Sequence, residues 1–277
     1  MKMSAQVALV VFLLFLVSYL LSCQAELPKD DTLELQLHTK GRQLLDQKGR
    51  EVLLRGFNAR VEGIFDVTFD DGRTALEPIP PFGEKDCQFL SEQLGMNLLR
   101  LPVNWSGIEP KKRGTYHLEY IKKFIKLADD CYKHGVYTLV DLHQDAYSKE
   151  IGEDGAPLWA IVPPPKKLLQ GPLHDLNTRR ASKDVLAAFE SFFENKETLQ
   201  DAYAEMSVYI VKQFKGHPGI IGLEIMNEPV LFGPNNQKRL HDFHMRVGKK
   251  VREVSANLPL FFEPNSLRNV LDLIAVS

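Results

Sequence analysis

The residues best suited to chemistry are Asn227 and Glu228, which lie between a short apolar run, residues 219–226, and Pro229. A short apolar run bounded by glycine and proline predicts a buried parallel strand, and Pro229 cannot continue its hydrogen-bond ladder. Parallel α/β folds place their chemistry at the carboxyl ends of such strands. A partly desolvated Glu228 could act there as a general acid. A solvated glutamate in a turn would account for the same residues.

Other predicted strands also end in polar residues. These are Asn58 after 51–57, Arg100 within 97–102, His143 and Asp145 after 136–141, and Glu263 at the end of 258–263. Carboxylates and amides bind sugar hydroxyls, and glycoside cleavage needs one carboxylic acid and a second carboxylate. Indole and phenol rings in the adjacent loops could stack on pyranose faces; these belong to Trp105, Tyr147 and Trp159. The set therefore points to sugar recognition.

Each of these residues also has an ordinary structural explanation. His143 could be a hydrogen-bonded core histidine, Arg100 a buried counter-ion and Trp159 a packing residue. Asn104 begins a glycosylation sequon, but its position just past a strand end favours a residue at the mouth of the fold without a glycan.

Helical patterns separate the predicted strands. They cover 84–94, 116–134, 184–214 with a break near Asn195, and 237–253, after a small hairpin of 33–37 and 43–46. This alternation predicts a parallel sheet with helical crossovers. Polar residues at so many strand ends favour a (β/α)8 TIM barrel over an open sheet, because a barrel brings all of these ends to one mouth. The long loops at 59–83 and 146–182 have the length of functional loops.

Within the central strand, Glu224 should share a face with Met226 and Glu228, because alternate residues of a strand point to the same side. A buried carboxylate must be paired or hydrogen-bonded. We therefore expect Glu224 to lie inside the barrel against Arg55 or Arg100.

Composition narrows the function and the location. The 277 residues are 44% hydrophobic and 25% charged with a net charge of −2, and no basic stripe suggests nucleic-acid binding. Lys2, the apolar run 7–21 and small residues up to Ala25 predict a signal peptide at 1–25 and a barrel domain at 26–277. The location would be extracellular or a lysosome-like lumen. An uncleaved membrane anchor, or a lipid on Cys23, are the alternatives.

Cys87 and Cys131 would remain after cleavage of the signal peptide. Both fall among apolar neighbours at helical spacing, which predicts two buried core thiols. A disulfide is allowed in an oxidising compartment, and the spacing does not suit a metal site.

Three motifs in this order, residues 98–102, 141–145 and 223–229, resemble those of glycoside hydrolase family five. Residues 141–147 followed by 153–160 look like the endoglycoceramidase branch of that family. The resemblance implies a retaining enzyme on a (β/α) barrel without metal or cofactor. It implies a glycolipid substrate that is cut between oligosaccharide and ceramide. We expect a monomer that contacts membrane surfaces transiently.

The resemblance also assigns roles to residues. Glu228 matches the acid/base and Asn227 matches the residue that binds the sugar 2-hydroxyl. Arg100 and His143 match residues that support the nucleophile and the sugar. Asp145 and Trp159 match the branch's sugar-contacting loop.

The nucleophile is the departure from the family pattern. The family places it on a glutamate at the end of the seventh strand, whereas five barrel strands are predicted here. We therefore expect it to lie beyond Ser277, in which case the chain is truncated and inactive alone. Glu263 ends the strand next to that of Glu228 and would approach the sugar from the same side, so it is expected to bind sugar hydroxyls. Another β-glucoside or a polysaccharide as substrate, or a non-catalytic sugar binder, are the alternatives.

Overall fold

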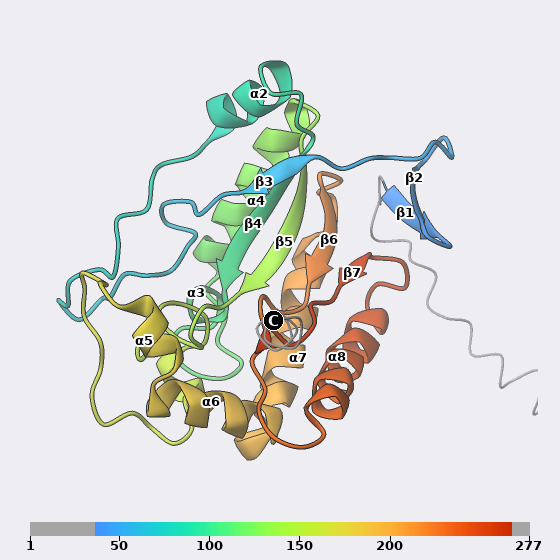
Figure 1. The fold of residues 1–277 in the computed structure, drawn as a ribbon. Helices are drawn as coiled ribbons and strands as arrows, with labels where there is room; N and C mark the ends of the chain where they lie inside the picture. Colours follow the sequence, from blue (N-terminus) through green and yellow to red (C-terminus); the bar gives the residue numbers. More distant parts are fainter. Residues whose placement is uncertain (1–36, 268–277) are drawn as a thin grey trace, which may run out of the picture.

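The computed structural model describes residues 37–267, and five parallel strands form its centre (Figure 1). The sheet order is β3-β4-β5-β6-β7, which is also the order along the chain. The strands are β3 (Gly56–Asn58), β4 (Leu98–Asn104), β5 (Tyr137–His143), β6 (Ile220–Glu224) and β7 (Leu260–Phe261). This is an incomplete α/β barrel. The expectations for residues 1–25 and 33–36 lie outside the described residues.

An antiparallel hairpin of β1 (Leu37–Lys40) and β2 (Gln43–Asp46) stands beside this sheet. The expected hairpin is confirmed in its second strand. In its first strand the prediction is confirmed at Leu37, and β1 runs on to Lys40, three residues past the predicted end.

The predicted helices are confirmed to within about two residues at most ends. They are α2 (Glu84–Glu92), α4 (Leu118–Lys133), α6 (Lys183–Phe193), α7 (Leu199–Gln213) and α8 (Asn236–Arg252). The predicted helix is interrupted between α6 and α7 at Asn195, whose φ of 54° cannot continue a right-handed helix. Short helices that were not predicted are also present. The 146–182 loop contains α5 (Leu176–Arg180) and the 3-10 turn η1 (Leu158–Ala160), α3 (Trp105–Ile108) follows β4, and the 3-10 turn η2 (Lys196–Thr198) lies between α6 and α7. None of the described helices has the length and apolar character needed to cross a membrane.

The hydrophobic core lies between the sheet and the helices that cover its outer face (Figure 1). Phe124 of α4, Phe192 of α6 and Phe243 of α8 are fully buried there. Each such side chain contributes roughly 2–3 kcal/mol through its removal from water. The packed helices therefore hold the strands, and with them the strand ends, in fixed positions.

The first barrel strand differs from the prediction of a buried strand at 51–58. Only Gly56–Asn58 pair with β4, and all three residues are exposed. Among the described residues β3 has one strand neighbour, so its side chains lack cover on the other side. In the apolar run before it, 76% of Leu53 is accessible to solvent, and Val52 and Leu54 are half-buried.

Cys87 and Cys131 form a disulfide that joins α2 to α4. Both residues are fully buried, as predicted, but they are not free thiols. Helical spacing places each side chain on the inner face of its own helix, and it does not reveal that the two faces meet. The bond closes a loop with a sequence separation of 44.

Removing this disulfide should lower the free energy of unfolding. For a sequence separation of 44 the chain-entropy model gives about 4 kcal/mol, and removal of native disulfides typically costs roughly 2–5 kcal/mol. Urea unfolding followed with and without dithiothreitol measures the effect. The double variant Cys87→Ser/Cys131→Ser is the control, since reductant should leave its midpoint unchanged. An equal response of both proteins to reductant would contradict this account.

Candidate active site

A half-buried arginine, Arg100 of β4, organises the carboxyl ends of the strands. Its Nε and Nη2 lie 2.7 and 2.6 Å from the two carboxylate oxygens of Glu224 on β6. Its Nη1 lies 3.0 Å from Oδ2 of Asp141 on β5. Burial alone would lower the pKa of Arg100, but the hydrogen bond to Glu224 and the charge of Asp141 raise it. The guanidinium therefore stays charged and draws two strand carboxylates together.

Glu224 thus lies where it was expected, inside the sheet against Arg100. Arg55, the other expected partner, donates to backbone oxygen of Gly95 instead. Burial would raise the pKa of Glu224, but the hydrogen bonds from Arg100 outweigh it and lower the pKa. Charge-assisted, two-pronged contacts of this kind are among the stronger polar interactions in proteins.

The shared face expected for residues 224, 226 and 228 is found only in part. Met226 lines a small apolar space of about 20 Å³ with Phe192 of α6 and Tyr203 of α7, on the helix side of the sheet. Regular strand geometry ends at Glu224, and Glu228 has a φ of 40°. Strict alternation therefore does not extend past the end of β6.

His143 at the end of β5 is paired with Asp141 of the same strand. Its Nδ1 lies 2.6 Å from Oδ2 of Asp141, which is fully buried. Burial alone would lower the pKa of His143, but the charge of Asp141 and the hydrogen bond to it raise the pKa well above its usual value. The imidazole is thus held in one orientation and carries positive charge near neutral pH.

Asn227 joins the two halves of this network. Its Oδ1 accepts a hydrogen bond from Nη2 of Arg100 at 2.9 Å, and its Nδ2 lies 3.4 Å from Nε2 of His143. Its own backbone N–H donates to Leu142 of the neighbouring strand at 3.1 Å. The amide side chain is buried, and its Nδ2 donates to the backbone oxygen of Gln144 at 3.0 Å, so both of its ends are fixed.

Glu228 follows Asn227 and is exposed, so the partial desolvation expected for it is not found. Its backbone N–H donates to Oε2 of Glu263 at 2.9 Å. Glu263 also lies 3.4 Å from Nη2 of Arg100. The structure therefore brings Arg100, His143, Asn227, Glu228 and Glu263 into one cluster, as the strand-end argument predicted.

The sequence interpretation missed Gln144, which locks the loop that carries Glu228. Its amide donates to the backbone oxygens of Asn227 and Glu228 at 2.8 and 2.9 Å. Its side-chain oxygen, Oε1, accepts a hydrogen bond from the backbone N–H of Tyr147. The signal was available, because a glutamine directly after a buried strand, between a histidine and an aspartate, is a polar residue in a buried position.

Asp145 lies at the edge of the cluster, between arginines from two loops. Arg180 of α5 and Arg60 of the 59–83 loop both pair with its carboxylate, and Nε2 of His143 is 3.8 Å away. Burial would raise the pKa of Asp145, but His143 and Arg180 outweigh it and lower the pKa. Arg60 also holds Glu153 at 2.9 Å. No periodicity in the loop sequence singled out Arg60.

The side chains around Asp145 are poorly suited to bind a metal cation. Among the described residues, ligand atoms of His143, Asp145 and Asp154 lie within 4.8 Å of one another. However, Asp145 is already neutralised by Arg60 and Arg180, and the raised pKa of His143 favours a proton on its ring. A proton and two guanidinium groups thus occupy the electrostatic role of a metal ion.

The expected sugar-stacking residues pack elsewhere. Nε1 of Trp159 donates to the backbone oxygen of Glu109 at 2.9 Å, and its ring meets the edge of Trp105 at 5.3 Å. Trp105 and Tyr147 are 3% and 4% exposed, so they belong to the core. The structure does not bring Trp159 to the Glu228 cluster.

Asn104 is likewise buried. Its amide donates to Asp154 and to the backbone oxygen of His143, so a glycan has no access to it in the folded chain.

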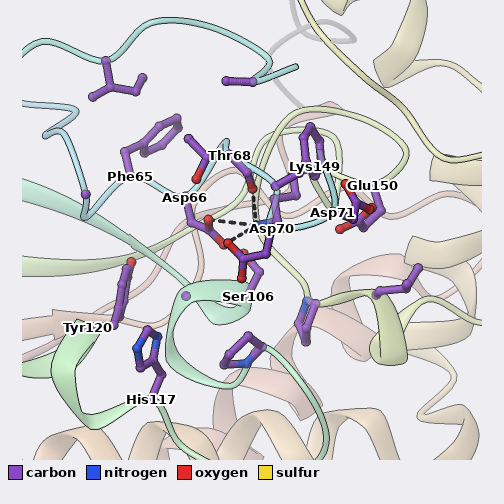
Figure 2. A pocket seen from close by; sticks show the side chains of 18 of the residues that line it. Phe65, Asp66, Thr68, Asp70, Asp71, Ser106, His117, Tyr120, Lys149 and Glu150 are labelled. Carbon is purple, nitrogen blue, oxygen red and sulfur yellow. Dashed lines mark hydrogen bonds and ion pairs between the residues drawn. The ribbon is translucent and has the colours of Figure 1, made fainter. Parts of the chain in front are cut away.

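A larger cavity of about 1040 Å³ lies beside the cluster, under the 59–83 loop (Figure 2). Lys149 reaches into it and contacts Asp66 at 2.8 Å. Phe65 forms part of its wall and packs edge-on against His143, with ring centroids 5.8 Å apart. One aromatic ring thus separates this cavity from the strand-end cluster.

Five parallel strands in chain order, with carboxylates, an arginine, a histidine and an asparagine at their carboxyl ends, define a barrel-type protein with an acid-rich site. Residues 45–276 match the family model described as Cellulase (glycosyl hydrolase family 5), and the chain belongs to that family. The family resemblance read from the sequence is confirmed.

Proteins of similar sequence also support the endoglycoceramidase branch of this family. The chain is 27% identical to an endoglycoceramidase of Cyanea nozakii, over 91% of this chain and 55% of that protein. It is 28% identical to an endoglycoceramidase of Hydra vulgaris, over 79% of this chain and 47% of that protein. The crystal structure of an endogalactoceramidase superposes with a TM-score of 0.71 at 26% identity, over 84% of this chain and 54% of that one. The chain thus spans about half the length of these relatives.

Replacing Arg100 should destabilise the fold strongly. Arg100→Met removes the cation that Glu224 and Asp141 share, and a buried ion pair broken on one side typically costs about 3–5 kcal/mol. Arg113→Met is the matched control, because Arg113 pairs with Glu205 at the surface and such pairs contribute roughly 0–1 kcal/mol. Chemical unfolding of both variants measures the difference. Equal losses would show that the Arg100 cluster has no special weight.

Proposed function

We propose that the chain carries the acid/base half of a retaining glycoside hydrolase that cuts glycolipids between oligosaccharide and ceramide. The observation that carries the proposal is the position of Glu228 beside Asn227, Arg100 and His143 at the carboxyl ends of β4 to β6. The glycolipid substrate is supported by the similarity to endoglycoceramidases from two animals and from Rhodococcus hoagii.

In this proposal Glu228 first protonates the glycosidic oxygen of the leaving group. It then acts as the base that activates water in the second step, as acid/base residues do in retaining enzymes. Its exposure gives a substrate direct access. Asn227 binds the sugar 2-hydroxyl from its fixed position. His143, held by Asp141, presents its protonated imidazole beside it. Arg100 orients Asn227 and neutralises the surrounding carboxylates.

The nucleophile is proposed to come from a strand outside the described residues. A retaining site needs two carboxyl groups roughly 5–5.5 Å apart on different sides of the anomeric carbon. The described carboxyl groups nearest Glu228, those of Glu224 and Glu263, come from its own and the adjacent strand and are bound to Arg100. They are committed to the protein's own network.

A sugar-binding function without turnover is the second candidate, because one catalytic carboxyl group alone permits recognition but not the two-step reaction. The disulfide supports an oxidising location for either function, extracellular or lumenal.

Turnover and binding assays on the 277-residue chain test these proposals. Hydrolysis is measured with an aryl β-lactoside that has a good leaving group. Binding of the two substrate classes is compared by calorimetry with lyso-lactosylceramide and cellotriose. We expect binding of the lactosyl lipid in preference to cellotriose, and no turnover by this chain. Preference for cellotriose would redirect the proposal to polysaccharides. Turnover that is lost in Glu263→Gln would place the nucleophile at Glu263 instead.

Glu228→Gln should separate chemistry from binding in a form of the protein that contains a complete barrel. Loss of a general acid typically reduces the rate by about 10²–10⁴-fold, and the reduction should be larger for lactosylceramide than for an activated aryl lactoside, which needs no protonation on departure. The dissociation constant for lyso-lactosylceramide should stay within a few fold. Glu253→Gln, on the exposed end of α8, is the control. Full activity of Glu228→Gln on lactosylceramide would exclude the proposed role.

A further inference from the structure

Glu263 has internal partners for both of its carboxylate oxygens. Oε2 accepts the backbone N–H of Glu228 at 2.9 Å, and Oε1 lies 3.4 Å from Nη2 of Arg100. The carboxyl group also shares a hydrogen bond with that of Glu224.

The backbone of Glu228 needs such a partner. Its φ of 40° places a residue with a side chain in the left-handed region, which such residues occupy only where their surroundings enforce it. Gln144 holds the carbonyl side of this residue, and Glu263 holds its N–H. Together they fix the two peptide units on either side of the Glu228 Cα, and these set the direction in which the Glu228 side chain leaves the protein.

We propose that Glu263 is a positioning residue, which fixes the backbone of Glu228 and so sets the direction of its carboxyl group, rather than a ligand for sugar hydroxyls. The proposal rests on the proposed acid/base role of Glu228 for its functional meaning. Its structural part, the bond from the Glu228 N–H to the Glu263 carboxyl group, stands independently of any activity.

The charges around Glu263 make its protonation state responsive near neutral pH. Burial and the hydrogen bond with Glu224 raise the pKa of Glu263 to about 7, against the opposing effects of the Glu228 N–H and Arg100. The other charged groups that face this cluster are Asp141 and His143 of β5, which are paired with each other. As the pH rises through about 7, Glu263 ionises and becomes a stronger acceptor for the Glu228 N–H.

Nuclear magnetic resonance of the Glu228 amide in the full 277-residue chain tests the structural part. In the unmodified chain its shift should titrate with a midpoint near pH 7. Glu263→Gln keeps an acceptor oxygen but cannot ionise, so this titration should disappear while the amide stays protected. In Glu263→Ala hydrogen exchange at Glu228 should be about tenfold faster, as expected for one lost hydrogen bond. Glu253→Gln should change none of these values.

Persistence of the titration in Glu263→Gln, or unchanged amide exchange in Glu263→Ala, would overturn the proposal. Glu263→Gln retains the hydrogen-bonding shape of the site, so it remains informative if Glu263→Ala does not fold.

Binding of isofagomine, a cationic sugar mimic, tests the functional part. Glu263→Ala should weaken binding about tenfold, and Glu263→Gln should stay within about threefold at pH 6, where the native side chain is largely protonated. Equal losses in both variants with an undisturbed Glu228 amide would identify Glu263 as a sugar ligand and overturn the proposal. Absence of binding by the unmodified chain would count against the proposed function, whereas the amide measurements would still decide the role of Glu263.

Discussion

The attraction between one half-buried guanidinium and the carboxylates around it determines how the strand ends are arranged. Arg100 of β4 reaches Asp141 on β5, Glu224 on β6 and Glu263 beyond β7. Three carboxylates this close together would repel one another without a cation at their centre. Because a guanidinium presents several N–H groups in one plane, it can serve all three strands at once, whereas a lysine would offer a single point of charge.

Two further features depend on this charge arrangement. Arg100 and His143 share one oxygen of Asp141, Oδ2, so the imidazole is oriented by the same carboxylate that the arginine anchors. Asn227 accepts from Arg100 and faces His143. The residues that would touch a substrate are therefore held by partners deeper in the sheet, which is the arrangement expected of a preorganised site.

The sequence was informative where local period or strand position decides the outcome. Short apolar runs located β4, β5 and β6, and helical patterns located the helices between them. The rule that parallel strands end at one edge brought Arg100, His143, Asn227, Glu228 and Glu263 together. The pairing of Glu224 with an arginine, predicted as Arg55 or Arg100, followed from the cost of burying a lone carboxylate. These arguments need no knowledge of distant contacts.

Long-range contacts account for what the sequence did not reveal. The exposure of β3 depends on which neighbours it has, and the disulfide depends on how α2 meets α4. Trp159 was assigned by its neighbourhood in the chain, but its indole finds Glu109, fifty positions away, as its partner. Arg60 and Gln144 act through contacts that loops and turns create, and no periodic pattern marks such residues in advance.

The chain-order arrangement of the five strands has a consequence for biosynthesis. Each strand pairs with the one made just before it, so the sheet can grow one unit at a time as the polypeptide leaves the ribosome. Arg100 emerges long before Glu224 and Glu263, with more than 120 residues between it and the first of them. During that interval its charge must stay in water or near Asp141 alone. The arrival of β6 is then the event that withdraws the guanidinium from solvent, and it makes the fourth βα unit the step that commits the nascent chain to its site.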